Sequence, residues 1–256
     1  MKKTLLIAGA LLCLGVSMAS AQGGLNLSWN DCGTFGQMQK NSACNSNTGA
    51  NTLVGSAISP VVIDQCVAMT TVLDLQTNQA ALSPWWNFDA APGTPPGVST
   101  GCRAVPASLS GDFNFTTSTF SCGDIWNGVA SGGINYVSQQ GGVPNRGRIR
   151  LVCAVVAPVV VDNSTENYYF KATFNNAKTT GTGNCAGCTD GACIVLNSLE
   201  LDQQPGVEGG NTIITNPLDS QYVLWQAGGN SVTPGGCPQA TPTKNATWGS
   251  VKSLYR

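Results

Sequence analysis

The 256-residue sequence contains no histidine, and Asp, Glu, Lys and Arg together make up only 10% of it. Without histidine the chain can form neither a Ser-His-Asp nor a Cys-His nucleophilic site, and it lacks the commonest general base. A Ser-x-x-Lys motif is also missing from the body of the chain, since Ser250-x-Lys252 has the wrong spacing. We therefore expect no catalytic residues and no enzymatic activity.

Carboxylates are the remaining route to catalysis, because glycoside hydrolysis needs two of them facing each other. Most acidic residues occur in turns or on the polar side of expected strands. The best pair is Glu200 and Asp202, which point the same way from a strand, as ordinary solvated side chains also do. A glycan-active enzyme is therefore the least favoured of three functional hypotheses.

The charge pattern also argues against nucleic acid as a partner. The formal net charge is −1, and the one basic cluster, Arg146, Arg148 and Arg150, alternates along an expected strand as one solvated face. Metal motifs are incomplete too. Cys185, Cys188 and Cys193 lack the second half of a paired zinc motif, and the oxygen-rich turn Asp162–Glu166 lacks EF-hand spacing. We expect no metal and no cofactor.

Residues 1–21 have the features of a Sec-type signal peptide. Lys2 and Lys3 precede an apolar run from Thr4 to Val16, and Ala19-Ser20-Ala21 is a small-residue cleavage site. The apolar run is too short for a full bilayer span, and no later stretch is apolar enough to be a transmembrane helix. The sequence thus predicts a secreted or cell-surface protein with no membrane span in the mature chain.

Cysteine content agrees with export. The chain has 11 cysteines, and removal of Cys13 with the leader leaves an even set suited to an oxidising compartment: Cys32, Cys44, Cys66, Cys102, Cys122, Cys153, Cys185, Cys188, Cys193 and Cys237. We expect all ten to be oxidised, in five disulfides.

Local pairing is favoured for Cys32 with Cys44 and for Cys102 with Cys122, because each pair closes one loop. Two bridges then fall among Cys185, Cys188, Cys193 and Cys237. This leaves Cys66 with Cys153, a pair at odds with the position of Cys66 on the polar face of its expected strand.

Alternation of apolar and polar residues is the main structural signal, and it predicts strands rather than helices. The expected strands are 61–75, 109–116, 148–155, 168–175, 193–201, 211–215 and 221–226. The Asp162-Asn163-Ser164 turn predicts a β-hairpin over 148–175. Turn-rich segments lie between the strands, at 90–97, 132–147, 179–191 and 228–242. The pattern indicates an all-β, antiparallel two-layer β-sandwich, Ig-like, cohesin-like or a jelly roll, with long disulfide-stapled loops.

The expected domain division has four parts. A signal peptide (1–21) precedes an N-terminal extension packed on the sandwich (22–60), the sandwich itself (61–243) and a C-terminal tail (244–256). In the tail, Trp248, Val251, Leu254 and Tyr255 form one apolar stripe of a short helix. A helix this short is unstable alone in water, so we expect it to dock on its own sandwich or on a partner.

Two resemblances follow from these segments. The order of the expected hairpin, the strand Tyr168–Phe174 and the strand Ile194–Leu201 resembles cohesin-like and carbohydrate-binding-module-like sandwiches. The segments Gly24–Gly33 and Thr247–Arg256 resemble the two ends of uncharacterised exported bacterial proteins. The first resemblance implies a sandwich fold, and the second implies no function.

Aromatic side chains offer the best functional lead. Trp85 and Trp86 follow Ser83-Pro84 in an expected loop, and Trp126 lies in another loop that carries a cysteine. Exposed planar rings are suited to sugar faces, although rings in loops also cap cores. We therefore expect a non-enzymatic binding module for an extracellular glycan or surface protein, with Trp85, Trp86 and Trp126 as contacts. A structural or adhesive cell-surface component is the alternative.

Overall fold

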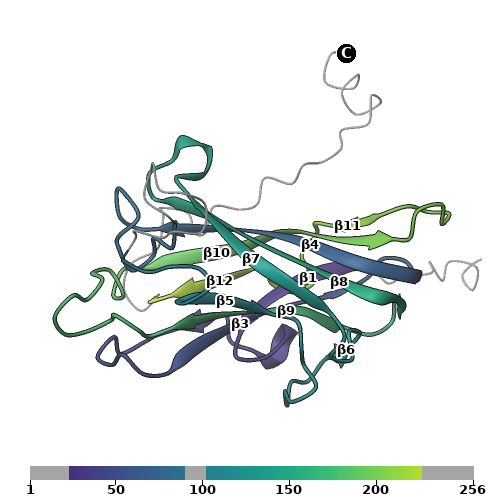
Figure 1. The fold of residues 1–256 in the computed structure, drawn as a ribbon, viewed down its shortest axis with the longest axis horizontal. Helices are drawn as coiled ribbons and strands as arrows, with labels where there is room; N and C mark the ends of the chain where they lie inside the picture. The colour runs from purple at the N-terminus through teal and green to yellow at the C-terminus, as the bar shows by residue number, and fades with distance from the viewer. Residues whose placement is uncertain (1–22, 90–101, 227–256) are drawn as a thin grey trace, which may run out of the picture.

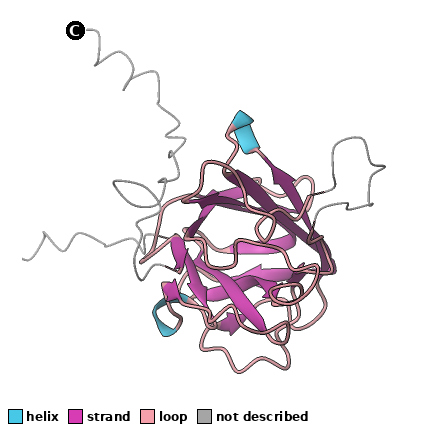
Figure 2. Cartoon of the chain, turned by 90° about the vertical axis from the view of Figure 1, so that its left-hand side faces the viewer, coloured by secondary structure: helices cyan, strands magenta, loops and turns pink. Residues whose placement is uncertain are grey.

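The computed structural model describes residues 23–89 and 102–226, and these form two β-sheets packed face to face (Figures 1 and 2). The expected leader and C-terminal tail lie outside the described residues. Among the described residues, no helix is long and apolar enough to cross a membrane. The all-β, two-layer architecture predicted from the alternation pattern is confirmed.

The first sheet has five strands in the order β1-β3-β9-β5, with β6 paired to β9. Its strands are β1 (Gly24–Trp29), β3 (Ala50–Ile58), β5 (Leu109–Asp112), β6 (Gly123–Asp124) and β9 (Asn167–Asn175). The segment 22–60, expected to be an extension, therefore supplies β1 and β3 and is part of the sandwich.

The second sheet has seven strands in the order β2-β12-β10-β4-β8-β7, with β11 paired to β10. Its strands are β2 (Gln39–Lys40), β4 (Ile63–Thr77), β7 (Ser131–Ser138), β8 (Arg146–Val161), β10 (Ala192–Gln203), β11 (Thr212–Ile214) and β12 (Tyr222–Trp225). Antiparallel pairing prevails, and β2 with β12 and β6 with β9 are parallel. β7 was missed in the sequence, because its Gly132-Gly133 pair and the Gln-Gln-Gly-Gly that follows favour turns.

The connection from β8 to β9 corrects the expected hairpin. The turn at Asp162 exists, with the carboxylate of Asp162 accepting hydrogen bonds from the N–H groups of Ser164 and Thr165. However, β8 belongs to the seven-stranded sheet and β9 to the five-stranded sheet. The turn therefore carries the chain from one layer to the other. Alternation marks both strands correctly, but it carries no information on which strands pair.

The long strand β4 has the expected buried face, with a change of phase near its start. Met69, Leu73 and Leu75 are buried, whereas Val61, expected to be buried, is 50% exposed. Register shifts against β8 occur on both sides of Cys66. These bulges turn Cys66 into the core, so its expected place on the polar face is wrong.

The disulfides link distant segments rather than neighbours. The bonded pairs are Cys32–Cys122, Cys44–Cys188 and Cys102–Cys185, and at least 83 residues separate the partners of each pair. The expected local pairs Cys32–Cys44 and Cys102–Cys122 are therefore wrong. Pairing is set by which loops meet at an end of the sandwich. In the chain-entropy model, loops this long give about 4–5 kcal/mol of stabilisation per bridge.

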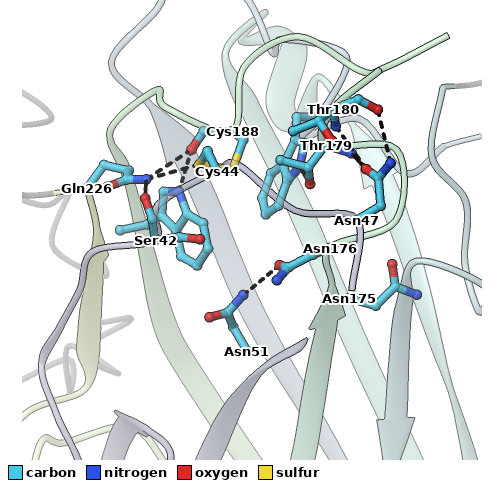
Figure 3. The surroundings of a disulfide bond; sticks show 12 residues. Ser42, Cys44, Asn47, Asn51, Asn175, Asn176, Thr179, Thr180, Cys188 and Gln226 are labelled. Atoms are coloured by element: carbon cyan, nitrogen blue, oxygen red, sulfur yellow. Dashed lines mark hydrogen bonds between the residues drawn. A yellow bond between two sulfur atoms is a disulfide. The ribbon is translucent and has the colours of Figure 1, made fainter. Parts of the chain in front are cut away.

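Figure 3 shows how one bridge is held in a polar frame. Beside the Cys44–Cys188 disulfide, the side-chain amide of Gln226 donates to the carbonyl oxygen of Ser42 at 2.7 Å. Nearby, the side-chain oxygen of Asn47 accepts hydrogen bonds from the backbone of Thr179 and Thr180. The loop before β3 is thus fixed to the loop after β9 by a covalent bond and by hydrogen bonds.

Two of the ten expected bridge cysteines, Cys66 and Cys153, are buried free thiols. Burial raises the pKa of Cys66 to about 11 and that of Cys153 to about 12. Both are therefore neutral at physiological pH, and a neutral thiol is a poor nucleophile. Cys193 is disulfide-bonded, with a partner outside the described residues.

We predict that iodoacetamide at pH 8 modifies neither Cys66 nor Cys153 in the folded protein and modifies both after unfolding in guanidinium chloride. The physical reason is the combination of burial and a raised pKa. Peptide mass spectrometry of the two samples measures it. A disulfide-linked peptide containing both cysteines would instead restore the original pairing.

Candidate functional site

The three tryptophans expected to contact a ligand are all buried, with exposed fractions of 0% for Trp85, Trp86 and Trp126. Each ring is held within the protein. The Trp85 ring stacks on Trp225 at 5.2 Å, and the Trp86 ring meets Trp85 edge-on at 4.7 Å. The expectation that these rings present a flat face to a sugar is therefore wrong. Loop position suggested exposure, but these loops fold inward over the end of the core.

Trp126 has the same role beneath another loop. Its indole N–H donates to the carbonyl oxygen of Tyr169 at 2.9 Å, and its ring lies edge-on to the ring of Tyr169. The backbone of Trp126 is positioned by Asp124, whose carboxylate accepts its N–H at 2.9 Å. The side chain thus fixes the β6 segment to β9 and has no free face.

A buried arginine, Arg103, completes the packing around Trp85. Its guanidinium lies 3.9 Å above the Trp85 ring and 5.1 Å from the Phe88 ring. It donates to the carbonyl oxygens of Trp85, Ser108 and Asn175. Burial lowers the pKa of Arg103 to about 9, so the group stays charged at neutral pH. Arg103 therefore ties the Trp85 loop to β9 and to the chain before β5.

Beside this cluster, the edges of the two sheets leave a cleft of about 460 Å³ between β5 and β7. Gly111 of β5 and the run Gly132–Tyr136 of β7 line it, together with Phe88, Asp89, Val105 and Pro106. The wall is mostly uncharged. This cleft was not expected from the sequence, where the one signal for it is an uncharged segment with the Ile134-x-Tyr136 alternation.

Close approach of the two edges depends on Gly111. A Cβ at this position would lie 2.9 Å from Leu151 Cδ2 and 3.2 Å from Ile134 Cβ. A side chain would therefore push β5 away from the seven-stranded sheet. At the other end of the cleft, the Tyr136 hydroxyl donates to the carbonyl oxygen of Trp86 at 2.8 Å. The cleft is thus positioned by the buried tryptophan cluster.

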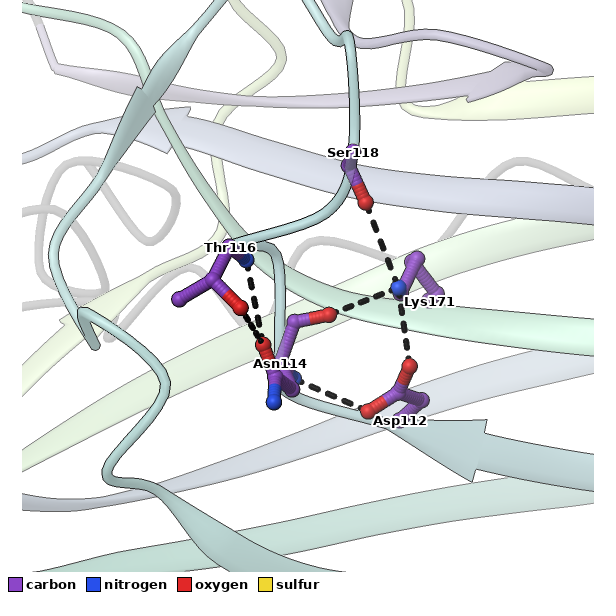
Figure 4. Close-up of polar contacts among 5 residues, drawn as sticks. All are labelled: Asp112, Asn114, Thr116, Ser118 and Lys171. Atoms are coloured by element: carbon purple, nitrogen blue, oxygen red, sulfur yellow. Dashed lines mark hydrogen bonds and ion pairs between the residues drawn. The ribbon is translucent and has the colours of Figure 1, made fainter.

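The end of β5 is fixed by a polar cluster around Lys171 of β9 (Figure 4). The Lys171 ammonium lies 2.8 Å from the Asp112 carboxylate and donates to the carbonyl oxygen of Asn114 at 2.7 Å. Burial works against the charged form of Asp112, but hydrogen bonds and the charge of Lys171 outweigh it and hold the pKa of Asp112 below its ordinary value. This ion pair anchors the strand that forms one wall of the cleft.

The backbone of β7 is the feature of the cleft that can bind a ligand. The Ser138 N–H donates to Asp89 at 3.0 Å, so it points away from β8. Because direction alternates along an antiparallel strand, the N–H and C=O groups of Ile134 and Tyr136 also point away from β8. Among the described strands, none pairs with β7 on that side. β7 therefore presents an open edge along the cleft.

Comparison with known proteins adds little. No protein-family model matches the chain, and no curated protein matches it significantly. Among solved structures, the chain is similar to a cohesin module from a family 33 glycoside hydrolase of Clostridium perfringens, with 8% identity and a TM-score of 0.37. The match covers 79% of this chain and 96% of that module. A likeness this distant carries no functional argument.

The other sequence candidates lie outside the cleft. Glu200 and Asp202 are side by side on β10, and both accept hydrogen bonds from the side-chain amide of Asn211. The arginines of β8 are on its outer face, where Arg148 pairs with Asp74 at 2.8 Å. In the described ranges, no group of three or more His, Cys, Asp or Glu residues is arranged to hold a metal ion.

We predict that Trp85→Ala lowers the free energy of unfolding by about 3–5 kcal/mol, the usual cost of removing a fully buried indole. Chemical denaturation with intact disulfides measures the change. Phe35→Ala is the control, because the Phe35 ring is 66% exposed and its removal leaves no cavity. A small effect of Trp85→Ala would show that this ring does not support the core.

We also predict a pH-dependent effect of Asp112→Asn. The variant loses the ion pair to Lys171, so it is less stable than the wild type at pH 7. A carboxylate whose pKa is lower in the folded than in the unfolded state stabilises the fold at pH values above the unfolded-state pKa, about 3.9. This stabilisation is lost as the pH falls through the folded-state pKa. The difference in melting temperature should therefore shrink below pH 4. Lys171→Met should remove the same contribution, and the double variant should cost less than the two changes added.

Proposed function

We propose that this protein is an exported, non-enzymatic binding module whose extracellular ligand is a polypeptide segment held in the cleft between β5 and β7. The open edge of β7 is the observation that carries this proposal. An extended peptide can add a strand to such an edge, with backbone hydrogen bonds supplying affinity and side-chain pockets supplying selectivity. Export is supported by the leader-like N-terminus and by the disulfides that link the loops.

The composition of β7 is typical of an edge strand that pairs with a ligand rather than of one that is protected against pairing. Proteins protect exposed edges with charged residues, proline or bulges. The eight residues Ser131–Ser138 include no charged residue and no proline, and their pairing with β8 has no register shift. An unprotected edge of this length would also be a site of self-aggregation, so a ligand that pairs with it has a physical reason to exist.

Three features favour a peptide over a glycan. The tryptophans that would stack on sugar are buried, and the cleft wall offers Phe88 and Tyr136, which are 2% and 4% exposed. The groups free to bond in the cleft are backbone N–H and C=O groups in strand spacing. Asp89, the charged residue in the lining, already accepts hydrogen bonds from Ser138.

The proposal is non-enzymatic because the described carboxylates form no facing pair in a cleft. Glu200 and Asp202 come from one strand, two residues apart, and share the amide of Asn211. Side-by-side carboxylates cannot act from opposite sides of a glycosidic bond. A structural or adhesive component, the alternative from sequence, would need no cleft at all.

We predict that phage-displayed random peptides screened against the mature protein enrich uncharged, extended sequences, and that Gly133→Trp weakens their binding at least about tenfold. A Cβ at Gly133 has nothing within 4 Å, so the indole is accommodated by the fold while it crowds the cleft. Val137→Trp is the matched control, since Val137 has the same orientation on β7 but does not line the cleft. Binding measured by interferometry should separate the two variants.

Two results would contradict the proposal. Equal binding by the Gly133→Trp and Val137→Trp variants would place the site elsewhere. Enrichment of glycans on an array, with no peptide selected, would return the ligand to the carbohydrate class.

A further inference from the structure

The outer face of the seven-stranded sheet carries an exposed apolar stripe along β8. Val152, Val156 and Val160 are 48%, 102% and 62% exposed, and Ala154 between them is also exposed. We call these four residues the valine patch. Val152 and Ala154 pair with β4, whereas Val156 lies in the irregular stretch between Ala154 and Val159. Single exposed apolar residues are normal on a protein surface, but a cluster of them marks an interaction surface.

Charges of both signs border the valine patch. Arg150 precedes Val152 on the same exposed face of β8, and two carboxylates lie across the sheet. Glu200 and Asp202 lie on the same outer face, on β10, two strands away from β8. Across the sheet, Glu200 is aligned with Val152 through Thr70 of β4, and Asp202 is aligned with Ala154 through Ala68 of β4. Neither carboxylate forms an ion pair within the described ranges. Burial, and then the charge of Glu200, raises the pKa of Asp202. A cation placed here would relieve the repulsion between the two carboxylates.

A disulfide bond links this face to a part of the chain outside the described residues. Cys193 lies on the outer side of β10, where it packs with Val195, Tyr222 and Leu224. It is disulfide-bonded to a cysteine outside the described residues, and the two there are Cys13, in the expected leader, and Cys237. Removal of the predicted leader, with Cys13, leaves Cys237 as the remaining cysteine for this bond.

The C-terminal segment has apolar and cationic side chains that complement the exposed valines and the carboxylates of this face. Residues 244–256 contain the apolar side chains Trp248, Val251, Leu254 and Tyr255 and the cations Lys244, Lys252 and Arg256. The reach is sufficient. The 11 residues from Cys237 to Trp248 span up to about 36 Å when extended, whereas Val152 lies roughly 25 Å from Cys193 by strand spacings of about 3.4 Å per residue along and 4.8 Å across the sheet.

We propose that the segment Lys244–Arg256 docks on the valine patch of its own chain, with its cations beside Glu200 and Asp202. The apolar stripe of the segment covers the exposed valines, and the disulfide at Cys193 raises its local concentration at the face. This inference is independent of the peptide site, because the cleft lies at the β7 edge and the valine patch lies on the outer face.

The test places a photo-reactive group in the full chain, with p-benzoylphenylalanine in place of Tyr255. After irradiation, mass spectrometry should find the p-benzoylphenylalanine at position 255 crosslinked within one chain to the tryptic peptide Leu151–Lys171, which contains the valine patch. Val152→Gln combined with Val156→Gln should lower that yield at least about fivefold, and neither change adds a tryptic site. Phe35→Gln is the control, because Phe35 is equally apolar and exposed but belongs to the turn beside β1 and β3.

Charge is tested by Glu200→Gln combined with Asp202→Asn, which should lower the crosslink yield at least about twofold at low salt and less at 0.5 M NaCl. The melting temperature of each variant shows that the fold is retained. Crosslinks between chains would show that a second copy occupies the face and would overturn the proposal. Crosslinks to another region, no crosslink, or a yield unchanged by the valine variants would overturn it as well.

Discussion

The structure depends on the packing of indole rings at the interface between the two sheets. Trp29 on β1 donates its N–H to the carbonyl oxygen of Leu224 on β12, in the opposite sheet. Trp225 on β12 donates to the carbonyl oxygen of Cys188, and its ring contacts Trp29, Trp85 and Trp86. A large apolar ring with one polar hydrogen suits this position, because it fills the interior and still satisfies its N–H. The rings therefore set both the distance between the sheets and their mutual orientation.

The cleft follows from this packing. Because Trp85 and Trp86 occupy the interior, the loop that carries them passes beside the edge of β7, where Tyr136 bonds to the carbonyl oxygen of Trp86. The rings themselves meet no ligand. They hold Phe88 and Asp89 at one wall of the cleft, while the Asp112–Lys171 pair holds β5 at the other. A change in the buried cluster should consequently alter binding indirectly, through the position of the wall.

The sequence was informative about strands and poor on their partners. Alternation located β4, β9, β10 and β12 because side chains that face the core alternate along much of each strand with less buried ones. Pairing depends on contacts between distant residues, so the β8–β9 hairpin and the local disulfides were wrong. β7 was missed because glycine weakens the signal of a strand, even though Gly132 and Gly133 sit in a regular ladder with β8. The burial of Trp85 was equally hidden, because proximity to Ser83-Pro84 indicates a loop but not whether that loop folds inward.

The two sheets differ in how much of their outer face is covered. On the five-stranded sheet, the loop after β5 lies over β9, where Phe115 stacks on Tyr168 at 4.1 Å and Phe120 meets it edge-on. The Cys32–Cys122 disulfide and the hydrogen bonds from Ser121 to Asp31 fix that loop in place. The seven-stranded sheet has no equivalent cover over β8 in the described part of the chain. Its open edge and its exposed valines are therefore two consequences of one asymmetry. The first sheet shows that a disulfide-anchored segment can cover an outer face in this fold, and the proposed docking of Lys244–Arg256, held near through the disulfide at Cys193, would cover the second sheet in the same way.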